Sequence, residues 1–375
     1  MVEVEGRRID TERKAGERRP ALRRPIAYLH YGHTIDAAAW ERRHADGLVP
    51  DRLPYGLDRL SGSGFDVAVR ARPSWARELT ARALRGLTGG FETPELVREA
   101  AHRRGSDLVV CWDERAGVGA TARARVPGEP PVASGVIWLT DPEAARSARN
   151  RAAARVLAKA DCLWVNAAAQ LDVLARWGVP RSRRHFVPMG VDPDFWDVGS
   201  AQSEGDLVVG GGNDRHRDHA LLVRAVSRLA ERRRGVRLEL ASHHPVDVPA
   251  ELGTRHPRLD HPAMRTLYGR ASVVVVAVRH NLHLSGLTTI LEAMACGRPV
   301  VATATPGMDH YIRDGETGLL VDADPSSIAD AVAGLLQEPE RARELGRRGR
   351  EVLERNFTTA HLSAGLAELL DRLAR

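Results

Sequence analysis

Residues 281–322 read NLHLSGLTTILEAMACGRPVVATATPGMDHYIRDGETGLLVD, and this stretch decides the fold. The apolar period over 287–294 predicts a helix with Ser285 as its N-cap, which ends at Gly297 before an apolar strand over 300–303. A helix that begins at the end of a βα unit presents unpaired N–H groups and the positive end of its dipole to an anion. The predicted anion-binding residues are Ser285, Gly286, Leu287 and Thr288.

Glu292 lies about two turns along this otherwise apolar helix. A buried carboxylate needs hydrogen-bond donors, and the hydroxyl pair of a ribose would supply them. The stretch therefore predicts a nucleotide site in an α/β fold. The alternative is an ordinary core helix that binds nothing.

Three segments of this stretch resemble the donor-sugar motif of the retaining nucleotide-sugar glycosyltransferases of family 4, which have the GT-B fold: Leu291–Gly297, Pro299–Thr303 and Asp314–Val321. The resemblance implies two doubly wound Rossmann-like domains that face each other across a cleft, with a nucleoside-diphosphate sugar as co-substrate and no cofactor. It also implies that Glu292 binds the ribose. The family's other motif glutamate would fall at Leu284 and is missing. His283–Gly286 instead resembles a His-x-Ser-Gly variant, which makes His283 a catalytic candidate.

A glycine-rich loop follows the apolar run 207–209. Glycines let backbone approach a ligand closely, and arginine binds phosphate oxygens through two N–H donors. The resemblance implies that Arg217 replaces a lysine that neutralises the leaving diphosphate, which makes it both a donor-binding and a catalytic candidate. Arg215 would be a second cation, and Asn213 completes the predicted donor loop. The alternative is a solvated surface turn.

We expect no metal ion at the transfer step. Preorganised cations and N–H groups can stabilise a leaving diphosphate by themselves. Two Asp-x-Asp sequences, 192–194 and 322–324, are of the kind that metal-dependent glycosyltransferases use, but each falls where the family has a structural loop. The resemblance therefore implies a retaining, metal-independent hexosyltransferase.

The first half of the chain matches the family less well. Family members often have His-Asp after the strand that we expect over 136–139, and here Thr140 replaces the histidine. Asp141 is a candidate base for the acceptor hydroxyl, and equally the N-cap of a helix with Pro142 at its first position. Gly32, in the turn after the first strand, is a candidate for close approach to the donor phosphates.

Apolar runs alternate with helix-like stretches along the chain, which predicts parallel sheets covered on both faces. We expect a basic flexible tail over 1–24, an acceptor-side Rossmann-like domain over 25–195 and a nucleotide-sugar donor domain over 196–357. A helix over 358–375 would cross back to the first domain. Strands are predicted over 26–30, 65–69, 108–111, 136–139, 162–165, 207–209, 237–240, 273–276 and 300–303, and helices over 94–104, 142–159 and 220–232.

Composition limits the classes of function. The apolar runs are far shorter than the roughly 20 residues that span a bilayer, and the charged amino terminus lacks the apolar stretch of a secretion signal, so we expect a cytoplasmic protein. The three cysteines fit reduced core thiols. Only two of the 55 basic residues are lysine, a bias typical of high-GC bacterial genomes, and few aromatics lie among the arginines. Nucleic-acid binding is therefore not expected, while weak membrane-surface contact and the oligomeric state stay open.

The expected setting is bacterial secondary-metabolite (antibiotic) or cell-envelope glycoconjugate biosynthesis. The substitutions at Leu284 and Thr140 motivate one alternative, a non-catalytic GT-B protein that binds nucleotide or scaffolds a partner glycosyltransferase. A second alternative is a GT-B sugar-nucleotide epimerase.

Overall fold

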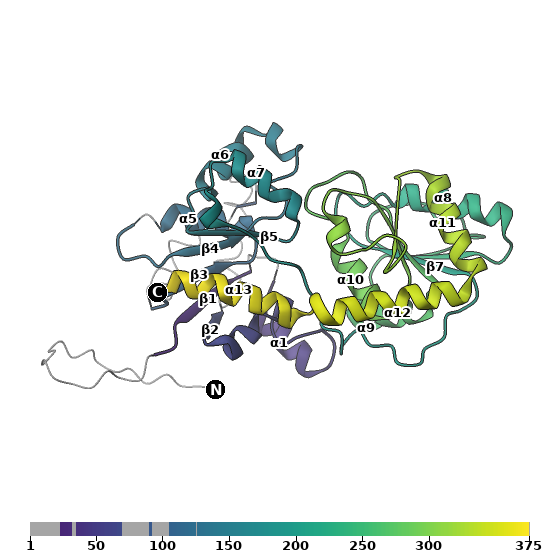
Figure 1. Ribbon diagram of the computed structural model, residues 1–375, viewed down its shortest axis with the longest axis horizontal. Helices are drawn as coiled ribbons and strands as arrows, with labels where there is room; N and C mark the ends of the chain where they lie inside the picture. Colours follow the sequence, from purple (N-terminus) through teal and green to yellow (C-terminus); the bar gives the residue numbers. More distant parts are fainter. Residues whose placement is uncertain (1–22, 32–34, 70–89, 92–104, 125, 375) are drawn as a thin grey trace, which may run out of the picture.

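The structure is a computed structural model that describes residues 23–31, 35–69, 90–91, 105–124 and 126–374, and every structural statement below refers to these residues. Two parallel sheets lie side by side, the first in the amino-terminal half and the second in the carboxyl-terminal half (Figure 1). The first contains β1 (Ile26–His30), β2 (Asp66–Val69), β3 (Leu108–Cys111), β4 (Val132–Gly135), β5 (Cys162–Val165) and β6 (Arg184–Phe186). The second contains β7 (Leu207–Gly211), β8 (Arg237–Ala241), β9 (Gly253–His256), β10 (Val273–Val276), β11 (Val300–Thr303) and β12 (Leu319–Val321).

The strand order explains where a ligand can bind. The second sheet has the order β12-β11-β10-β7-β8-β9, which is that of a Rossmann fold, and the order reverses between β7 and β10. The first sheet has the order β2-β1-β3-β4-β5-β6 and reverses between β1 and β3. In open α/β sheets the binding crevice lies at such a switch point, beyond the carboxyl ends of the strands. The loops that follow β3, β7 and β10 are therefore the ones to examine.

Helices cover the sheets, as continuous apolar strands require. In the first half the helices are α1 (Ala37–Ala45), the 3-10 helix η1 (Pro54–Ser63), α5 (Glu114–Arg123), α6 (Ala148–Leu157) and α7 (Leu171–Arg176). In the second half they are α8 (His219–Arg232), α9 (His261–Arg270), α10 (Leu287–Ala295), α11 (Pro325–Gln337) and α12 (Pro339–Asn356). None of the described helices is long and apolar enough to cross a membrane.

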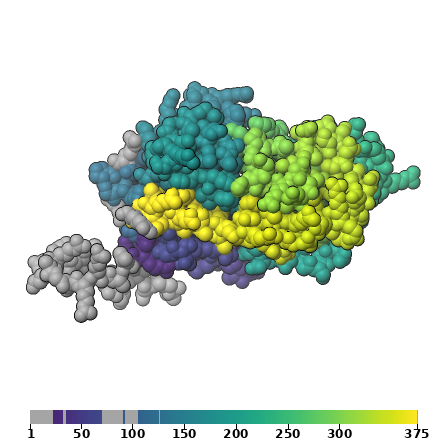
Figure 2. Space-filling view, in the orientation of Figure 1, coloured from purple at the N-terminus to yellow at the C-terminus, as the bar shows by residue number. Residues whose placement is uncertain are grey.

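The carboxyl-terminal helix α13 (Thr359–Ala374) returns to the first half. It packs against η1, and with α12 it forms a continuous band across both halves (Figure 2). The chain passes between the halves at Val191 and again at Thr358, and the two passages pair: the Val191 N–H donates to the Phe357 carbonyl, and the Thr359 N–H donates to the Val191 carbonyl. The two halves are thus joined by two adjacent backbone segments.

Most of the predicted strands are confirmed. The bounds of β1, β3, β5, β10 and β11 agree with the prediction. The strand predicted over 136–139 is wrong: β4 ends at Gly135, and the N–H groups of residues 137–139 donate to the Glu114 carboxylate instead of to a neighbouring strand. The helix predicted over 142–159 is shorter, and the helix predicted over 94–104 lies outside the described residues.

Residues 23 and 24 of the predicted tail are held against the first half. The Arg23 guanidinium donates to both carboxylate oxygens of Asp107 at 2.9 Å, and Arg24 donates to the Ser61 carbonyl. The part of the predicted tail over 1–22 lies outside the described residues.

Candidate functional site

Helix α10 begins where the sequence places it, but its N-cap is Gly286 and the predicted cap, Ser285, is wrong. Gly286 has φ 92°, a left-handed conformation that glycine adopts without strain, and the Ser285 hydroxyl donates to Asp214 at 2.8 Å. Leu284, where the family has its other glutamate, is buried with φ 54°. This start of α10 lines a cavity of about 350 Å³ that residues of the first half close from the other side, among them Trp112 and Trp138.

Arg217 lines the same cavity and is only 8% exposed. Its Nη2 donates to the Thr289 hydroxyl at 2.6 Å, and its Nε has no hydrogen-bond partner among the described residues. The guanidinium fits because its neighbours Gly212 and Gly286 have no side chains: a Cβ on Gly212 would lie 2.4 Å from Nη2, and one on Gly286 would lie 2.7 Å from Nη1. No salt bridge to Arg217 is formed in the described part of the chain. The charges of Asp214 and Glu292 act on Arg217 from a distance, so a buried cation faces the cavity without a direct ion-pair partner.

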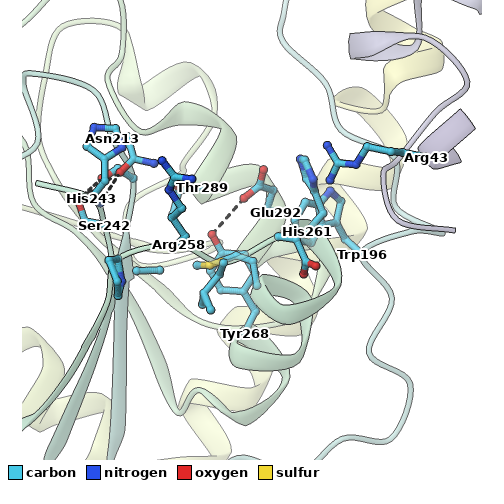
Figure 3. Close-up of a pocket in the computed structure, with 16 residues that line it drawn as sticks. Arg43, Trp196, Asn213, Ser242, His243, Arg258, His261, Tyr268, Thr289 and Glu292 are labelled. Atoms are coloured by element: carbon cyan, nitrogen blue, oxygen red, sulfur yellow. Dashed lines mark hydrogen bonds between the residues drawn. The ribbon is translucent and has the colours of Figure 1, made fainter. Parts of the chain in front are cut away.

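Glu292 lines a second cavity, of about 620 Å³ (Figure 3). The Tyr268 hydroxyl donates to its Oε2 at 3.1 Å, and Trp196, Ser242 and Asn213 contribute to the same wall. Burial raises the pKa of Glu292 to about 7, against the opposing effects of the Tyr268 hydroxyl and the Arg217 charge. A carboxylate with one donor has lone pairs left for a ligand's hydroxyl groups.

Four side chains form a cluster at the boundary of the two halves. Asp141 comes from the first half, and Asp214, His216 and His283 come from the loops after β7 and β10. His283 Nδ1 lies 2.7 Å from Asp141 Oδ2, and its Nε2 lies 3.3 Å from Asp214 Oδ2. His216 Nδ1 lies 3.3 Å from Asp214 Oδ1. One imidazole thus bridges carboxylates from both halves.

The charges of the cluster follow from its contacts. Burial opposes a charged His283, but the two carboxylates outweigh it and raise its pKa to about 9. The pKa of Asp141 is lowered: burial opposes this, and contact with His283 and the Leu282 N–H outweighs burial. Burial lowers the pKa of His216. At neutral pH His283 is therefore the protonated member of the cluster.

Ligand atoms of Asp141, His216 and His283 also lie within 4.8 Å of one another, a spacing that a divalent metal ion could use. Imidazole and carboxylate suit zinc and similar ions. Asp141 and His283 are already in direct contact, so a metal ion would have to displace the His283 proton.

The predicted site residues do not all meet. Arg217 and the start of α10 share the cavity of about 350 Å³, Glu292 lines the adjoining one, and Asn213 lines both. Arg215 is exposed and lines a third cavity.

Asp141 is 1% exposed behind the cleft. Its alternative reading as a helix cap is wrong, because Ser147 caps α6 and the Asp141 carboxylate accepts the Leu282 N–H. Gly32 lies outside the described residues.

Several residues at the site were not predicted, among them Asp214, His216, Trp138 and Tyr268. Asp214 accepts hydrogen bonds from Ser285, from Trp138 Nε1 at 3.2 Å and from the His216 backbone at 2.8 Å. Its position inside the glycine-rich loop was a signal that could have found it. Trp138 and Tyr268 carry no local signal, because only the fold brings them beside the loop and beside Glu292.

Two doubly wound parallel sheets with a site between their carboxyl edges define the GT-B class of glycosyltransferase structures. Sucrose-phosphate synthase from Thermosynechococcus elongatus matches with a TM-score of 0.68 and 21% identity, over 94% of this chain and 99% of that one. Anabaena HepE in complex with UDP-glucose matches with a TM-score of 0.69 and 15% identity, over 92% and 99% of the two chains. At these identities the likeness shows the fold.

Residues 206–338, which contain the second sheet, match the family model Glycosyl transferases group 1. A D-inositol 3-phosphate glycosyltransferase of Xylanimonas cellulosilytica is 31% identical over 243 residues, which are 57% of this chain and 58% of that protein. Alpha-maltose-1-phosphate synthase of Mycolicibacterium smegmatis is 38% identical over 91 residues, 22% of this chain and 24% of that protein. The chain thus spans less than two thirds of the length of these relatives.

Proposed function

We propose that the chain is a retaining glycosyltransferase that moves a hexosyl group from a nucleoside-diphosphate sugar to an acceptor hydroxyl. The observation that carries the proposal is Arg217, a buried cation that forms no salt bridge among the described residues and lies beside the start of α10. A buried unpaired charge is costly in the free protein, and a diphosphate would neutralise it.

The donor would lie along two adjoining cavities. Its ribose hydroxyls would donate to Glu292 in the larger cavity, and its diphosphate would lie against Arg217 and residues 285–289 in the smaller one. The sugar would then reach toward His283 and the tryptophans of the first half. In the transfer, the bond from C1 to the phosphate oxygen breaks and a bond from C1 to the acceptor oxygen forms, while the acceptor proton passes to the leaving diphosphate. Stabilising the charge on that diphosphate is the main task of the protein.

Retention of configuration is proposed from the resemblance to family 4. For the setting, the names of curated relatives favour inositol or mannosyl glycoconjugates over secondary metabolites, since they include a D-inositol 3-phosphate glycosyltransferase and a phosphatidylinositol monomannoside mannosyltransferase. We also propose a cytoplasmic location.

We propose further that no metal ion takes part at the diphosphate. In the cluster of Asp141, His216 and His283, a proton on His283 would take the place that a metal ion could occupy. The raised pKa of His283 supports the proton. Metal analysis of the purified protein and turnover with and without EDTA test this. One bound equivalent of zinc, or activity abolished by EDTA and restored by zinc, would contradict it.

A thermal-shift screen against UDP, GDP, dTDP and ADP and their common sugars tests donor binding, because a ligand that binds only the folded state must raise its melting temperature. One nucleotide should raise it selectively. Arg217→Ala and Glu292→Ala should each reduce the rise, and Arg149→Ala, an exposed arginine outside the lining of these cavities, should not. No shift with any nucleotide would contradict the proposal.

Leu284 favours one alternative, a GT-B protein that binds nucleotide without transferring sugar, because a buried leucine stands in place of the family's sugar-side glutamate. Release of nucleoside diphosphate from the donor, with a panel of acceptors, separates the two. A donor that binds and is never consumed, with any acceptor, would favour the alternative.

A further inference from the structure

A third cavity, of about 480 Å³, adjoins the cavity of Arg217 and shares Trp138, Asn213 and Asp214 with it. Most of its lining comes from the first half: Phe91, Glu114, Arg115, Leu139, Ala144 and Asn150, with Arg215 from the second half. It shares Asn213 with the cavity of Glu292 as well, while Glu292 itself lines neither of the two smaller cavities. If the donor occupies the first two cavities, the third is where an acceptor can reach the sugar.

The two acidic side chains of this cavity are already hydrogen-bonded. The Glu114 carboxylate is 2% exposed and accepts the backbone N–H groups of Ile137, Trp138 and Leu139 at 2.7–2.8 Å. The Asp214 carboxylate accepts from Ser285 and Trp138 and contacts His283. Neither carboxylate needs a donor from a ligand.

The two arginines of the cavity are free to bind a ligand. Arg115 lies over the Trp138 ring at 4.2 Å, a cation–π contact that holds the guanidinium in place and leaves its N–H groups unused. No ion pair to Arg115 is formed among the residues that the structure describes. The Arg215 side chain is 54% exposed, and its only ion-pair contact within those residues is a distant one, 3.8 Å to Asp141.

The backbone adds to this positive character. Arg115 lies in the first turn of α5 and Asn150 in the first turn of α6, so the amino termini of two helices end at the cavity. Each helix directs its positive dipole end toward a ligand there. Two unengaged guanidinium groups and two helix starts together favour an anion.

We infer that this cavity binds an anionic group of the acceptor, a phosphate ester or a carboxylate, through Arg115 and Arg215. The inference rests on the proposed function, since it assigns the acceptor of that reaction. Guanidinium binds both anions through paired N–H donors, so the protein selects acceptors by a charged group next to the hydroxyl that receives the sugar.

The test uses acceptors that differ in one group: glucose, glucose 6-phosphate and glucuronate, and likewise glycerol, glycerol 3-phosphate and glycerate. Calorimetry measures binding without turnover, with the nucleoside diphosphate present at saturation so that the donor site is filled. Release of nucleoside diphosphate measures transfer. At least one anionic form should bind ten-fold or more tightly than its neutral counterpart, and comparison of the phosphate and carboxylate forms identifies the group.

Variants locate the anion. Arg115→Gln and Arg215→Gln should each raise the acceptor KM or Kd about 10- to 100-fold, the range for loss of one charge-assisted hydrogen bond. In Arg115→Gln the donor KM and nucleotide binding should stay unchanged. Arg149→Gln on α6 removes the same charge from an exposed residue that does not line the cavity, and should change neither.

Two results would overturn the inference while nucleotide binding and transfer remained intact. One is equal use of the neutral and anionic acceptors. The other is unchanged acceptor binding in both Arg115→Gln and Arg215→Gln. Failure of the proposed function looks different, because either no nucleotide would bind in the thermal-shift screen or a bound donor would never be consumed with any acceptor.

Discussion

Glu292 is the residue at which function and stability oppose each other. Burial raises its pKa to about 7, so the folded protein favours the protonated form. Because the folded-state pKa lies above the unfolded value, this group stabilises the fold at low pH, and its contribution is lost as pH rises through 7. The proposed contact with a ribose needs the ionised form, which accepts two hydroxyl donors.

Glu292→Gln should therefore raise the stability of the free protein and lower its affinity for the nucleotide. The side chain reaches a cavity, so the gain at pH 8 should be about 1–2 kcal/mol, less than full burial would give, and it should disappear near pH 5. Urea unfolding at the two pH values measures the stability, and calorimetry measures the nucleotide. Glu316→Gln, at an exposed glutamate, is the control. A variant with unchanged stability and unchanged affinity would refute the assignment.

His283 has a pH dependence of the same sign, displaced to higher pH. Its folded-state pKa of about 9 lies above the unfolded value, so its stabilising contribution is fully present below about pH 6.5 and is lost as pH rises through 9. His283→Gln leaves Asp141 and Asp214 without their shared cation and should cost about 2–3 kcal/mol at pH 7.

Chemical unfolding measured at pH 7 and at pH 10 checks this expectation. The cost should be smaller at pH 10, and Asp141→Asn should reduce the cost of His283→Gln at pH 7, because it removes one of the unpaired carboxylates. A cost that is the same at both pH values would mean that His283 is neutral in the folded protein.

The sequence predicted individual site residues well where one loop holds them and poorly where the fold brings them together. Arg217 and Glu292 could be found because each lies in a motif. The contact between Asp141 and His283 joins residues from different sheets, and no local pattern encodes it. The same reason hid Trp138, whose indole N–H reaches Asp214 across the cleft.

At the scale of elements, the turn that starts α10 and the loop after β7 are built around one guanidinium. A Cβ on Gly286 would lie 2.5 Å from Val276 Cγ1 and 2.7 Å from Arg217 Nη1, and its φ is 92°. Gly286→Ala should therefore combine backbone strain with overpacking and cost about 2–4 kcal/mol. It should also weaken nucleotide binding by displacing Arg217.

Gly235→Ala is the matched control. Gly235 has φ 89°, close to that of Gly286, and a Cβ there would meet nothing within 4 Å. It should cost only the strain of a left-handed residue, about 1–2 kcal/mol, and leave nucleotide binding unchanged. Urea unfolding of both variants separates the two effects. If both variants lost the same free energy of unfolding, the space beside Arg217 at Gly286 would not be filled.

Strands were predictable where burial on both faces demands a continuous β-branched run. Val273–Val276 is such a run, and its bounds agree with β10. In β4 the strand is Val132–Gly135, with small residues: a Cβ on Gly135 would lie 2.1 Å from the Trp112 carbonyl oxygen, so the close approach to β3 requires glycine. The residues just after β4 are more apolar, so the sequence predicted the strand four residues too late in the chain.

At the scale of the whole molecule, Asp51 ties α13 to the first half. Its carboxylate is 3% exposed and accepts from the Thr359 hydroxyl at 2.9 Å and from Arg59. Burial raises its pKa to about 6, with the hydrogen bonds of Arg59 and Thr359 opposing the shift and the nearby Asp192 charge adding to it. The folded-state pKa lies above the unfolded value, so the contribution of Asp51 to stability falls as pH rises from about 4 to 6.

Asp51→Asn removes this titration and keeps a residue that tolerates the φ of 52° found at this position. The stability of the variant relative to the natural chain should rise by about 2 kcal/mol between pH 4.5 and pH 7.5. Guanidinium unfolding at these two pH values measures the change. Asp46→Asn, an exposed aspartate after α1, should show no such trend. If the stability difference between Asp51→Asn and the natural chain were the same at both pH values, the Asp51 carboxyl would titrate normally.

The return of α13 also sets the order in which the protein can be completed during synthesis. Leu57 and Leu60 of η1 belong to the same apolar core as Leu362, Leu366 and Leu370 of α13, yet some three hundred residues separate the two groups. A ribosome adds about 5–20 residues per second, so η1 waits on the order of ten seconds or more for its partner helix to be made. During that time its leucines lack the apolar cover that α13 provides, so the nascent amino-terminal half exposes a surface that chaperones can bind.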